Sequence, residues 1–233
     1  MLLAQTPAGT VTARLAVTRD DLEAAARLVH DVYVARGLRD AARPRDSDAN
    51  RSVVFIARLA GVVGATISLV TDGPRGLPAD ALYGPELRAL RGRRRRLAEV
   101  SGLAVATRCR GSALALVRPL VQLVGIYARD IEHADELCIA VHPRHAPFYA
   151  RAFGFAPFGA EKPYPAVKDA PAVGLRLDLH RPPVPGALSA VLFESEEIAR
   201  VRAALDADLR RMQILQFRPR SRPLRPFHAT EVC

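Results

Sequence analysis

The sequence predicts an α/β fold in which helices flank a mixed central sheet. Three observations favour this class. Strand and helix patterns alternate along the chain, 49% of its 233 residues are hydrophobic, and a strand-like run ending near Ala106 leads through a small-residue turn into a helical pattern. A chain of this length can bury most of a three-layer structure. We expect one main domain over residues 1–180 and an extension, 181–233, with one helix and an Arg/Pro-rich tail.

The first half of the chain is predicted to contain a strand, a helix, a hairpin, a second helix and another strand. Apolar and polar side chains alternate in the strands, whereas the first helix has an apolar face and a cap at Thr18. The Ala60-Gly61 turn between two β-branched runs indicates the hairpin. In order, these segments are strand 10–17, helix 22–35, strands 53–59 and 62–70, helix 78–90 and strand 97–106.

The second half continues the alternation. We expect Pro119 to kink the first of its helices and Gly154 to end the second. Residues 159–171 are rich in turn-forming residues and are expected to be a loop. In order, the segments are helix 112–130, strand 136–141, helix 143–153, strands 155–158 and 173–179, and a charged helix over 194–213.

The run that follows the predicted strand 97–106 has the composition of a phosphate-binding turn. It carries positive charge, and its small residues let backbone N–H groups approach a ligand closely. The positive N-terminus of the next helix would add to the attraction. We therefore expect a phosphate-bearing ligand to contact the turn residues, which are Arg108, Arg110, Gly111, Ser112 and Ala113.

The formal net charge of +10 is compatible with three anionic partners: nucleic acid, a membrane surface, or an acidic protein or phosphate ligand. Nucleic acid is disfavoured because aromatic residues make up only 6% of the chain, with no Trp, and no nucleic-acid-binding motif is present. The densest basic cluster, 88–96, is either a solvated turn or a docking patch for an acidic carrier protein. Peripheral association with a membrane stays open.

Cysteine usage and the N-terminal sequence favour a cytoplasmic protein. The three cysteines, Cys109, Cys138 and Cys233, form no CxxC pair, so we expect reduced thiols and no metal site. Cys109 is expected to be a small filler rather than a nucleophile. We find no uninterrupted apolar run of the roughly 18 residues that a membrane span needs, and no signal-peptide pattern at the start of the chain.

The signature Arg108-x-x-Gly111-x-Ala113 resembles the acyl-donor loop of the GNAT (Gcn5-related) acyltransferase superfamily, which holds the pantetheine and phosphates of coenzyme A or acyl carrier protein. The order of elements up to about Leu179 also resembles the GNAT fold. Five further segments resemble the FeeM-type N-acyl amino acid synthases, whose fold is similar to that of acyl-homoserine-lactone synthases. These segments are 28–37, 64–70, 76–78, 98–105 and 142–149.

The resemblance implies transfer of a long acyl chain from acyl carrier protein to the α-amine of an amino acid. Backbone amides from Leu103 to Val105 would polarise the thioester carbonyl, Glu99 would help to take the amine proton, and Tyr149 would protonate the leaving thiolate. Because Glu99, Ser101 and Leu103 alternate, an unbroken strand would place their side chains on one face. Ser101 is therefore a candidate substrate contact.

Simpler roles remain open for several of these residues. Glu99 would otherwise be a solvent-facing or Arg-paired carboxylate, and Tyr149 an aromatic packing residue. We also expect a contact to the carboxylate of the amino acid, and Arg36 or Arg51 is the candidate for it.

We expect the other titratable residues near the predicted helix 143–153 to be structural, with His142 ending a strand and His145 satisfying a loop carbonyl.

Three functions follow from these observations. The first is an N-acyl amino acid synthase that uses an acyl-phosphopantetheine donor, on acyl carrier protein or alternatively on coenzyme A, with no permanently bound cofactor. The second is an N-acetyltransferase that uses acetyl-CoA. The third is a non-catalytic module that senses acyl donors or lipids. The sequence leaves the acceptor amino acid, the acyl chain length and the oligomeric state open.

Overall fold

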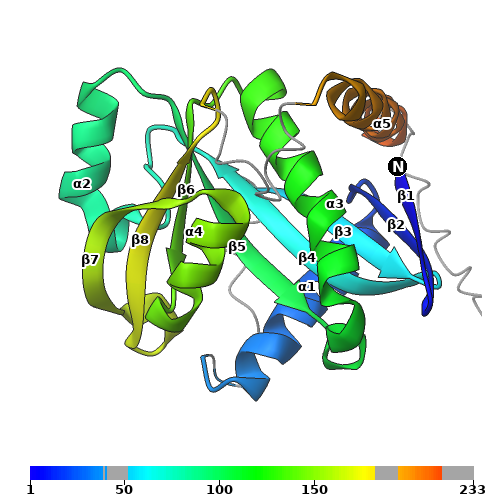
Figure 1. Ribbon diagram of the computed structural model, residues 1–233, viewed down its shortest axis with the longest axis horizontal. Helices are drawn as coiled ribbons and strands as arrows, with labels where there is room; N and C mark the ends of the chain where they lie inside the picture. The colour runs from blue at the N-terminus through cyan, green and yellow to red at the C-terminus, as the bar shows by residue number, and fades with distance from the viewer. Residues whose placement is uncertain (39, 41–51, 182–193, 217–233) are drawn as a thin grey trace, which may run out of the picture.

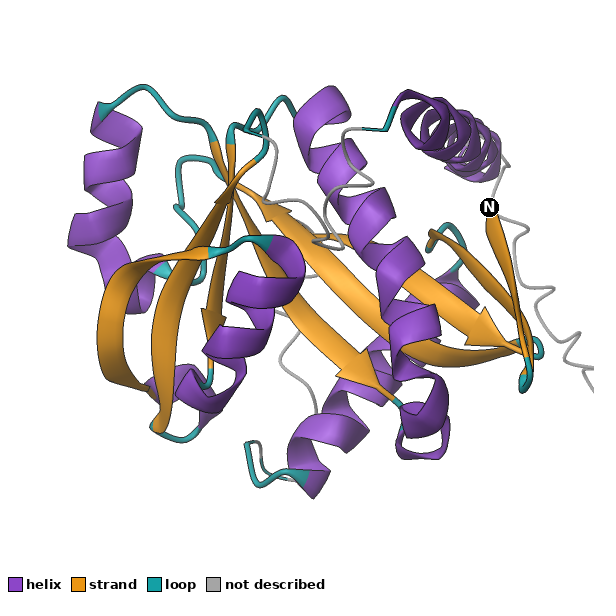
Figure 2. Cartoon of the chain, in the orientation of Figure 1, coloured by secondary structure: helices purple, strands orange, loops and turns teal. Residues whose placement is uncertain are grey.

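The computed structural model describes residues 1–38, 40, 52–181 and 194–216. An α/β architecture is confirmed, with helices on both faces of one mixed sheet (Figures 1 and 2). The strands are β1 (Leu2–Thr6), β2 (Gly9–Leu15), β3 (Ser52–Leu59), β4 (Val62–Thr71), β5 (Leu97–Val105), β6 (Glu136–Val141), β7 (Ala156–Tyr164) and β8 (Ala170–Asp178). The helices are α1 (Arg19–Ala35), α2 (Asp80–Gly92), α3 (Ala113–Ile126), α4 (Ala146–Phe153) and α5 (Ser195–Gln216).

The eight strands form a single sheet in the order β1-β2-β3-β4-β5-β6-β8-β7. Every neighbouring pair is antiparallel except β5 and β6, which are parallel. The crossover between these two parallel strands is α3, as a parallel pair requires. The largest core cluster lies between the sheet and α3, α4 and α5, whereas smaller clusters lie under α1 and α2 on the other face.

The N-terminus of α1 is held to the sheet by a buried carboxylate. Thr18 and Asp21 form a capping box, which satisfies backbone N–H groups that the first turn leaves unpaired. The Asp21 side chain, 1% exposed, also accepts hydrogen bonds from Arg14 at 2.7 Å and Arg58 at 3.0 Å. These two arginines belong to β2 and β3, so one carboxylate joins the helix to two strands.

Helix α5 completes the main core beside the N-terminus of the chain (Figure 1). Val201 and Leu205 are fully buried in the main core cluster, and Asp208 accepts a hydrogen bond of 3.1 Å from the backbone N–H of Leu15. The edge strand β1 was not predicted from the sequence. Among its residues only Leu2 is buried, so the strand lacks the alternating pattern that would reveal it.

Two predicted segments differ from the structure in detail. Residues 159–171, expected to be a loop after a short strand, instead continue β7 to Tyr164 and contain the start of β8 at Ala170. The helix expected over 112–130 begins with a 3₁₀ segment, Thr107–Ser112, and ends in a π-helical turn, Tyr127–Ile131, and α3 continues through Pro119. The segment 107–131 is long and apolar enough to cross a membrane. This finding differs from our expectation that the sequence contains no such segment. However, 61% of its most apolar window is buried in the fold, as expected of a core helix.

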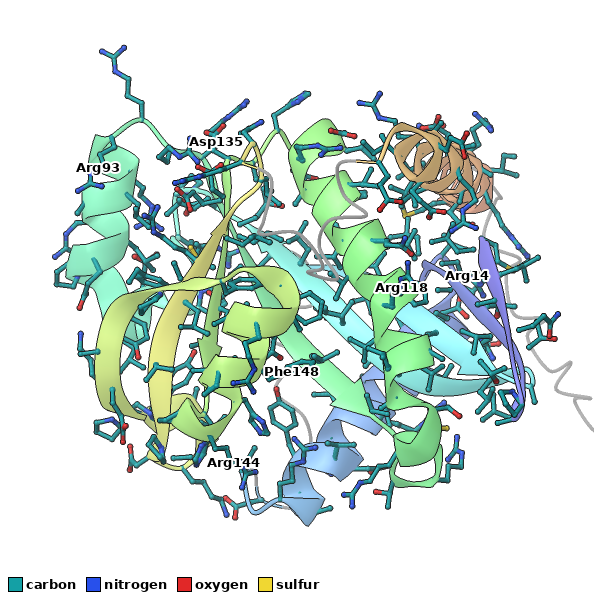
Figure 3. The ribbon with its side chains drawn as sticks, in the orientation of Figure 1. Arg14, Arg93, Arg118, Asp135, Arg144 and Phe148 are labelled. Carbon is teal, nitrogen blue, oxygen red and sulfur yellow. The ribbon has the colours of Figure 1, made fainter. Side chains whose placement is uncertain are left out.

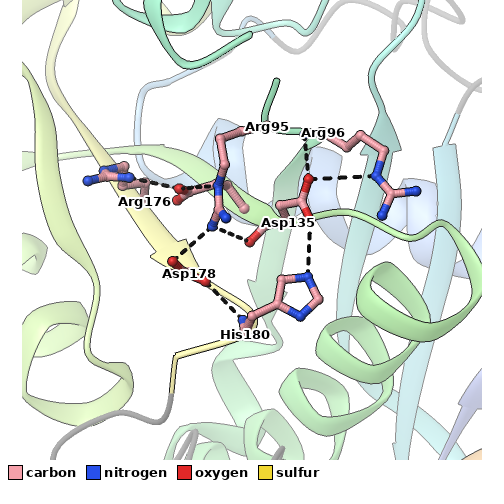
Figure 4. A network of polar contacts seen from close by, with 7 residues as sticks. Arg95, Arg96, Asp135, Arg176, Asp178 and His180 are labelled. Atoms are coloured by element: carbon pink, nitrogen blue, oxygen red, sulfur yellow. Dashed lines mark hydrogen bonds and ion pairs between the residues drawn. The ribbon is translucent and has the colours of Figure 1, made fainter. Parts of the chain in front are cut away.

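Ion pairs hold β5, β6 and β8 together where β5 and β6 begin (Figure 4). Arg95 donates to the buried Glu136 at 3.1 Å and pairs with Asp178 at 2.8 Å. The backbone N–H of Arg96 donates to Asp135 at 2.8 Å. These contacts fix the spacing of the two parallel strands at one end only.

Candidate active site

Strands β5 and β6 separate along their length and open the sheet. Their pairing runs from Leu97 and Glu136 only as far as Glu99 and Cys138, although β5 continues to Val105 and β6 to Val141. Figure 2 shows the two strands diverging from a common end. On the side that faces the split, the backbone groups of β5 beyond Glu99 are therefore not paired with β6, and they are open to a ligand.

A β-bulge in β5 determines which side chains face each side of the sheet. Ser101 lies opposite Ser68 and Ala104 opposite Thr66, so β5 has one extra residue between these pairs. Gly102, with φ of +60°, occupies the bulge in a conformation that favours glycine. The prediction that Leu103 shares a face with Ser101 is therefore wrong. Leu103 instead packs against the main core cluster on the α3 side.

A cavity of about 890 Å³ passes through the split, with lining residues on both faces of the sheet. Toward α1 the lining is partly polar and includes Tyr33, Ser68, Glu99 and Ser101. Toward α3 and α4 it is apolar, and it includes Val117, Val121, Val124, Leu137 and Phe153. The apolar face predicted for α1 has a further role, because most of it, including Leu22 and Val29, lines the cavity.

Glu99 is buried, with 3% of its surface exposed, in the wall of the cavity. Its Oε2 accepts a hydrogen bond of 2.7 Å from the backbone N–H of Ala79, which holds the side chain in place. The alternative of a solvent-facing carboxylate is therefore wrong. A carboxylate held beside the split can accept a proton from a reacting group.

Tyr149, on α4, both lines the cavity and belongs to an aromatic cluster. Its ring centroid lies 6.0 Å from that of Phe153 and 5.9 Å from that of Phe155. Burial, together with nearby Tyr33, raises the pKa of the Tyr149 phenol to about 12. The phenol therefore stays protonated at neutral pH and can donate a proton.

Basic side chains line one rim of the cavity. Arg36 follows α1, and His142, Arg144 and His145 follow β6; Figure 3 shows Arg144 at the end of the molecule opposite Arg93. Burial, and then the charges of Arg144, Arg36 and His142, lower the pKa of His145. In the part of the chain that the structure describes, His145 accepts from Arg144 and satisfies no loop carbonyl, contrary to our expectation.

Sequence reasoning assigned no role in the site to Arg144, although it belongs to the run His142-Pro143-Arg144-His145 directly after a predicted strand. A cluster of basic residues at the end of a buried strand was the available signal. Arg51, the other predicted carboxylate clamp, lies outside the described residues.

The predicted phosphate-binding turn lies next to the cavity in the chain but does not line it. Arg110, Gly111, Ser112 and Ala113 form the end of the 3₁₀ segment and the start of α3, and no side chain caps that helix. A Cβ atom at Gly111 would meet open space. Arg108 folds back, and its Nη2 donates to the Val63 carbonyl at 3.1 Å. Val105 also lies outside the cavity lining.

Half of the arginines in the cluster 88–96 are held in ion pairs, whereas Arg88, Arg93 and Arg94 are exposed. Arg91 is paired with Asp72 and Asp80, and Arg95 and Arg96 belong to the ion pairs of Figure 4. The cluster precedes β5, whereas the split and the turn lie toward the opposite end of that strand. Among the described residues, no group of three His, Cys, Asp or Glu side chains could hold a metal ion.

Comparison with known proteins agrees with this geometry. The structure of FeeM, an N-acyl amino acid synthase from uncultured soil microbes, is similar with a TM-score of 0.64 and 34% identity, over 72% of this chain and 91% of that chain. Two more distant structures share the fold. The CoA-dependent acyl-homoserine lactone synthase BjaI has a TM-score of 0.56 and 20% identity, over 83% of this chain and 98% of that chain. A spermidine N-acetyltransferase from Vibrio cholerae has a TM-score of 0.50 and 14% identity, over 72% of this chain and 94% of that chain. No match is found among curated proteins.

These structures confirm the GNAT fold predicted from the sequence, and the similarity to FeeM identifies the chain as an acyltransferase. The family model described as "N-acyl amino acid synthase FeeM" matches residues 24–178, which include β3 to β8 and both walls of the split. The chain belongs to the FeeM family of N-acyl amino acid synthases.

Proposed function

We propose that this acyltransferase moves a long acyl chain from the phosphopantetheine thioester of acyl carrier protein to the α-amine of an amino acid. The single observation that carries the proposal is the cavity through the split between β5 and β6. At about 890 Å³ it lies near the upper end of the roughly 300–1,000 Å³ typical of small-molecule sites. It joins a partly polar compartment beside Glu99 to an apolar one under α3.

The apolar compartment supports a long chain over an acetyl group. Val117, Val121 and Val124 line it along two turns of α3, a distance of about 10 Å at the rise of an α-helix. An acetyl group would leave most of this apolar surface uncovered. Burial of successive methylene groups along it would instead favour a long-chain donor.

In the proposed reaction the amine attacks the carbonyl carbon of the thioester directly, without a covalent acyl-enzyme. Backbone N–H groups of β5 beyond Glu99 stabilise the oxyanion of the tetrahedral intermediate. Glu99 takes the proton that the amine nitrogen loses, directly or through one water molecule. Ser101, two residues along the same face, contacts the acceptor.

When the intermediate collapses, the C–S bond breaks, and the Tyr149 phenol gives its proton to the departing sulfur. The proton taken by Glu99 returns to the phenol through solvent, so the products are the N-acyl amino acid and free pantetheine thiol. The pKa of about 12 keeps the phenol protonated before this step, so a proton is available when negative charge develops on the sulfur.

The donor is held as a substrate rather than as a resident cofactor. Helix α3 continues directly from the 3₁₀ segment, and the Ala113 N–H already donates to the Arg110 carbonyl. We assign the donor phosphate to the turn itself, where Arg110 is exposed and Ser112 has a hydroxyl group that can donate. Acyl carrier protein and coenzyme A share the phosphopantetheine arm, so this contact serves either donor.

The test offers purified protein palmitoyl-acyl carrier protein, palmitoyl-CoA or acetyl-CoA with pooled amino acids, and follows products by mass spectrometry. Long-chain N-acyl amino acids made fastest from the carrier-protein thioester, and lost in Glu99→Gln, are expected. Preference for palmitoyl-CoA would overturn the choice of donor carrier. Turnover of acetyl-CoA alone would indicate an acetyltransferase. Binding of acyl donors without turnover would indicate a sensing module.

A further inference from the structure

Four basic side chains converge on one rim of the cavity, and we call Arg36, His142, Arg144 and His145 the rim cluster. Arg36 lies at the C-terminal cap of α1, and the other three lie in the turn that follows β6. All four line the cavity. The split strands and α1 thus bring together residues from distant parts of the sequence.

Hydrogen bonds within the rim cluster orient Arg144. Its Nε donates to Nε2 of His145 at 3.2 Å, and its backbone N–H donates to Nδ1 of His142 at 3.2 Å. A ring nitrogen that accepts a hydrogen bond carries no proton. A neutral His145 agrees with the lowering of its pKa by burial and by the charges of Arg144 and Arg36. The fixed positive charges of the cluster are therefore the two guanidinium groups.

These two guanidinium groups have no carboxylate partner within residues 1–38, 40, 52–181 and 194–216. Elsewhere in the fold, Arg91 and Arg95 are each paired with two carboxylates. Lys168, which also lines the cavity, is paired with Asp40. Arg36 and Arg144 are both exposed, and the charges of both act on His145. Two such guanidinium groups can bind a carboxylate or phosphate, because the N–H donors of each are fixed in a planar fork.

We propose that Arg36 and Arg144 form a carboxylate subsite, which binds the α-carboxylate of the acceptor and restricts the enzyme to acceptors that carry one. This inference rests on the proposed function and adds the recognition of its acceptor. In an α-amino acid one carbon separates the amine from the carboxylate. A carboxylate held at the rim therefore fixes where the amine can attack.

The position of the rim cluster relative to Tyr149 supports the assignment. The charge of Arg36 acts on the Tyr149 phenol and counteracts part of the rise in its pKa, so the guanidinium lies within electrostatic reach of the proposed acid. The turn that we propose for the donor phosphate, residues 108–113, lies outside the cavity lining. An anion bound between Arg36 and Arg144 is thus better explained by the acceptor.

The direct test compares two ligands by isothermal titration calorimetry: N-dodecanoylglycine, which carries a carboxylate, and N-dodecanoylglycinamide, which does not. We expect the wild-type protein to bind the acid at least tenfold more tightly. Arg36→Gln and Arg144→Gln should each reduce that preference several-fold, and the double variant should abolish it. Arg36→Lys should retain part of it. Arg93→Gln, an exposed control that follows α2, should keep the full preference.

Equal binding of the two ligands by the wild-type protein, or an unchanged preference in the double variant, would overturn the inference. Kinetics distinguish the two possible sources of the anion. An increase in KM for the amino acid in Arg36→Gln, with the donor KM unchanged, supports the acceptor, whereas an increase in the donor KM alone assigns the site to a phosphate and contradicts the proposal. Because the calorimetry needs no turnover, a preference for the acid without amino-acid acylation would refute the proposed function and leave the carboxylate subsite standing.

Discussion

The Glu99 carboxylate accepts a hydrogen bond of 2.7 Å from the backbone N–H of Ala79, the residue just before α2. This contact links the strand that borders the split to the loop beside the cavity, where Pro78 is also a lining residue. The buried acid therefore has a fixed position beside the split. Glu99 thus has two separable roles, which are acceptance of a proton and acceptance of the hydrogen bond from Ala79.

Glu99→Gln separates these two roles. The amide oxygen can still accept the hydrogen bond from Ala79, but a glutamine cannot take a proton from the amine. We expect kcat to fall by about 100-fold or more, in the range that general-base catalysis contributes, while the melting temperature changes little. Release of free thiol from an acyl-thioester donor measures the rate.

The matched control is Glu161→Gln, which removes an exposed carboxylate on β7 and should leave the rate unchanged. A full rate in Glu99→Gln would show that another group, or water, takes the proton. Glu99 would then be a structural ligand of the Ala79 amide.

Tyr149→Phe tests the proposed acid while keeping the aromatic packing. We expect kcat to fall at least tenfold with little change in KM, because only the hydroxyl is removed. Since the pKa of Tyr149 is raised to about 12, its ionisation should cause no loss of wild-type activity up to about pH 10. A pH profile of kcat from 6 to 10 checks both statements, and an unchanged kcat in the variant would leave Tyr149 a packing residue.

Local patterns were enough to predict most elements of this fold, because the periodicity of apolar side chains is a property of each segment by itself. The hairpin of β3 and β4 and the helix α1 are confirmed on that basis. Features that depend on a partner could not be predicted. The bulge at Gly102 requires the register with β4, and without it Leu103 was assigned to the wrong face.

The candidate site divides in the same way. Glu99, Ser101, Leu103 and Tyr149 line the cavity, and each belongs to a segment with a family-like pattern. Arg36 and the turn after β6 line the same cavity because of the way α1 crosses the sheet. The pattern of a single segment does not reveal such an arrangement. The same limit applies to the cluster 88–96, whose carboxylate partners come mostly from other elements.

Asp21→Asn should destabilise the fold, because Asp21 joins α1 to β2 and β3. Burial opposes the ionisation of Asp21, but hydrogen bonds from Arg58, Arg14 and Thr18 outweigh it and lower the pKa from 3.8 to about 2. A carboxylate whose pKa is lower in the folded state stabilises above the unfolded value, and that contribution is lost as the pH falls toward 2. The shift corresponds to about 2 kcal/mol at neutral pH.

Thermal unfolding between pH 6 and pH 2 measures this contribution. The wild-type melting temperature should fall most steeply below pH 4, and Asp21→Asn should show a lower value at pH 6 and a weaker dependence on pH. Asp20→Asn, at the exposed neighbouring position of the same first turn, is the control. Equal pH dependence in wild type and Asp21→Asn would show that other carboxylates dominate.

Gly102→Ala tests the bulge. The new Cβ would lie 3.4 Å from Ser68 Oγ and 3.7 Å from Val29 Cγ2, so the cost comes from φ of +60° and not from a clash. We expect a loss of about 1–2 kcal/mol in the free energy of unfolding. If the bulge positions the backbone amides, kcat should also fall under conditions in which the Gly102→Ala protein is fully folded. Gly111→Ala, where a Cβ meets open space, should leave stability within about 0.5 kcal/mol.

The apolar compartment should set the length of the acyl chain, and Val121→Phe tests this directly. Val121 is a partly buried lining residue on α3, where a phenyl ring would fill space that a long chain needs. Each methylene excluded from an apolar site costs about 0.8 kcal/mol, so excluding two should lower kcat/KM for a palmitoyl donor more than tenfold. An octanoyl donor should be affected little, because a shorter chain ends before the substituted position.

The measurement is competition between octanoyl and palmitoyl thioesters, with products quantified by mass spectrometry. Val62→Phe, the same substitution at an exposed position of β4, should keep the wild-type ratio. An equal loss with both donors in Val121→Phe would mean that the added phenyl ring disturbs the split itself. An unchanged ratio would place the acyl chain outside the α3 side of the cavity, and the partly polar side toward α1 would then have to hold both substrates.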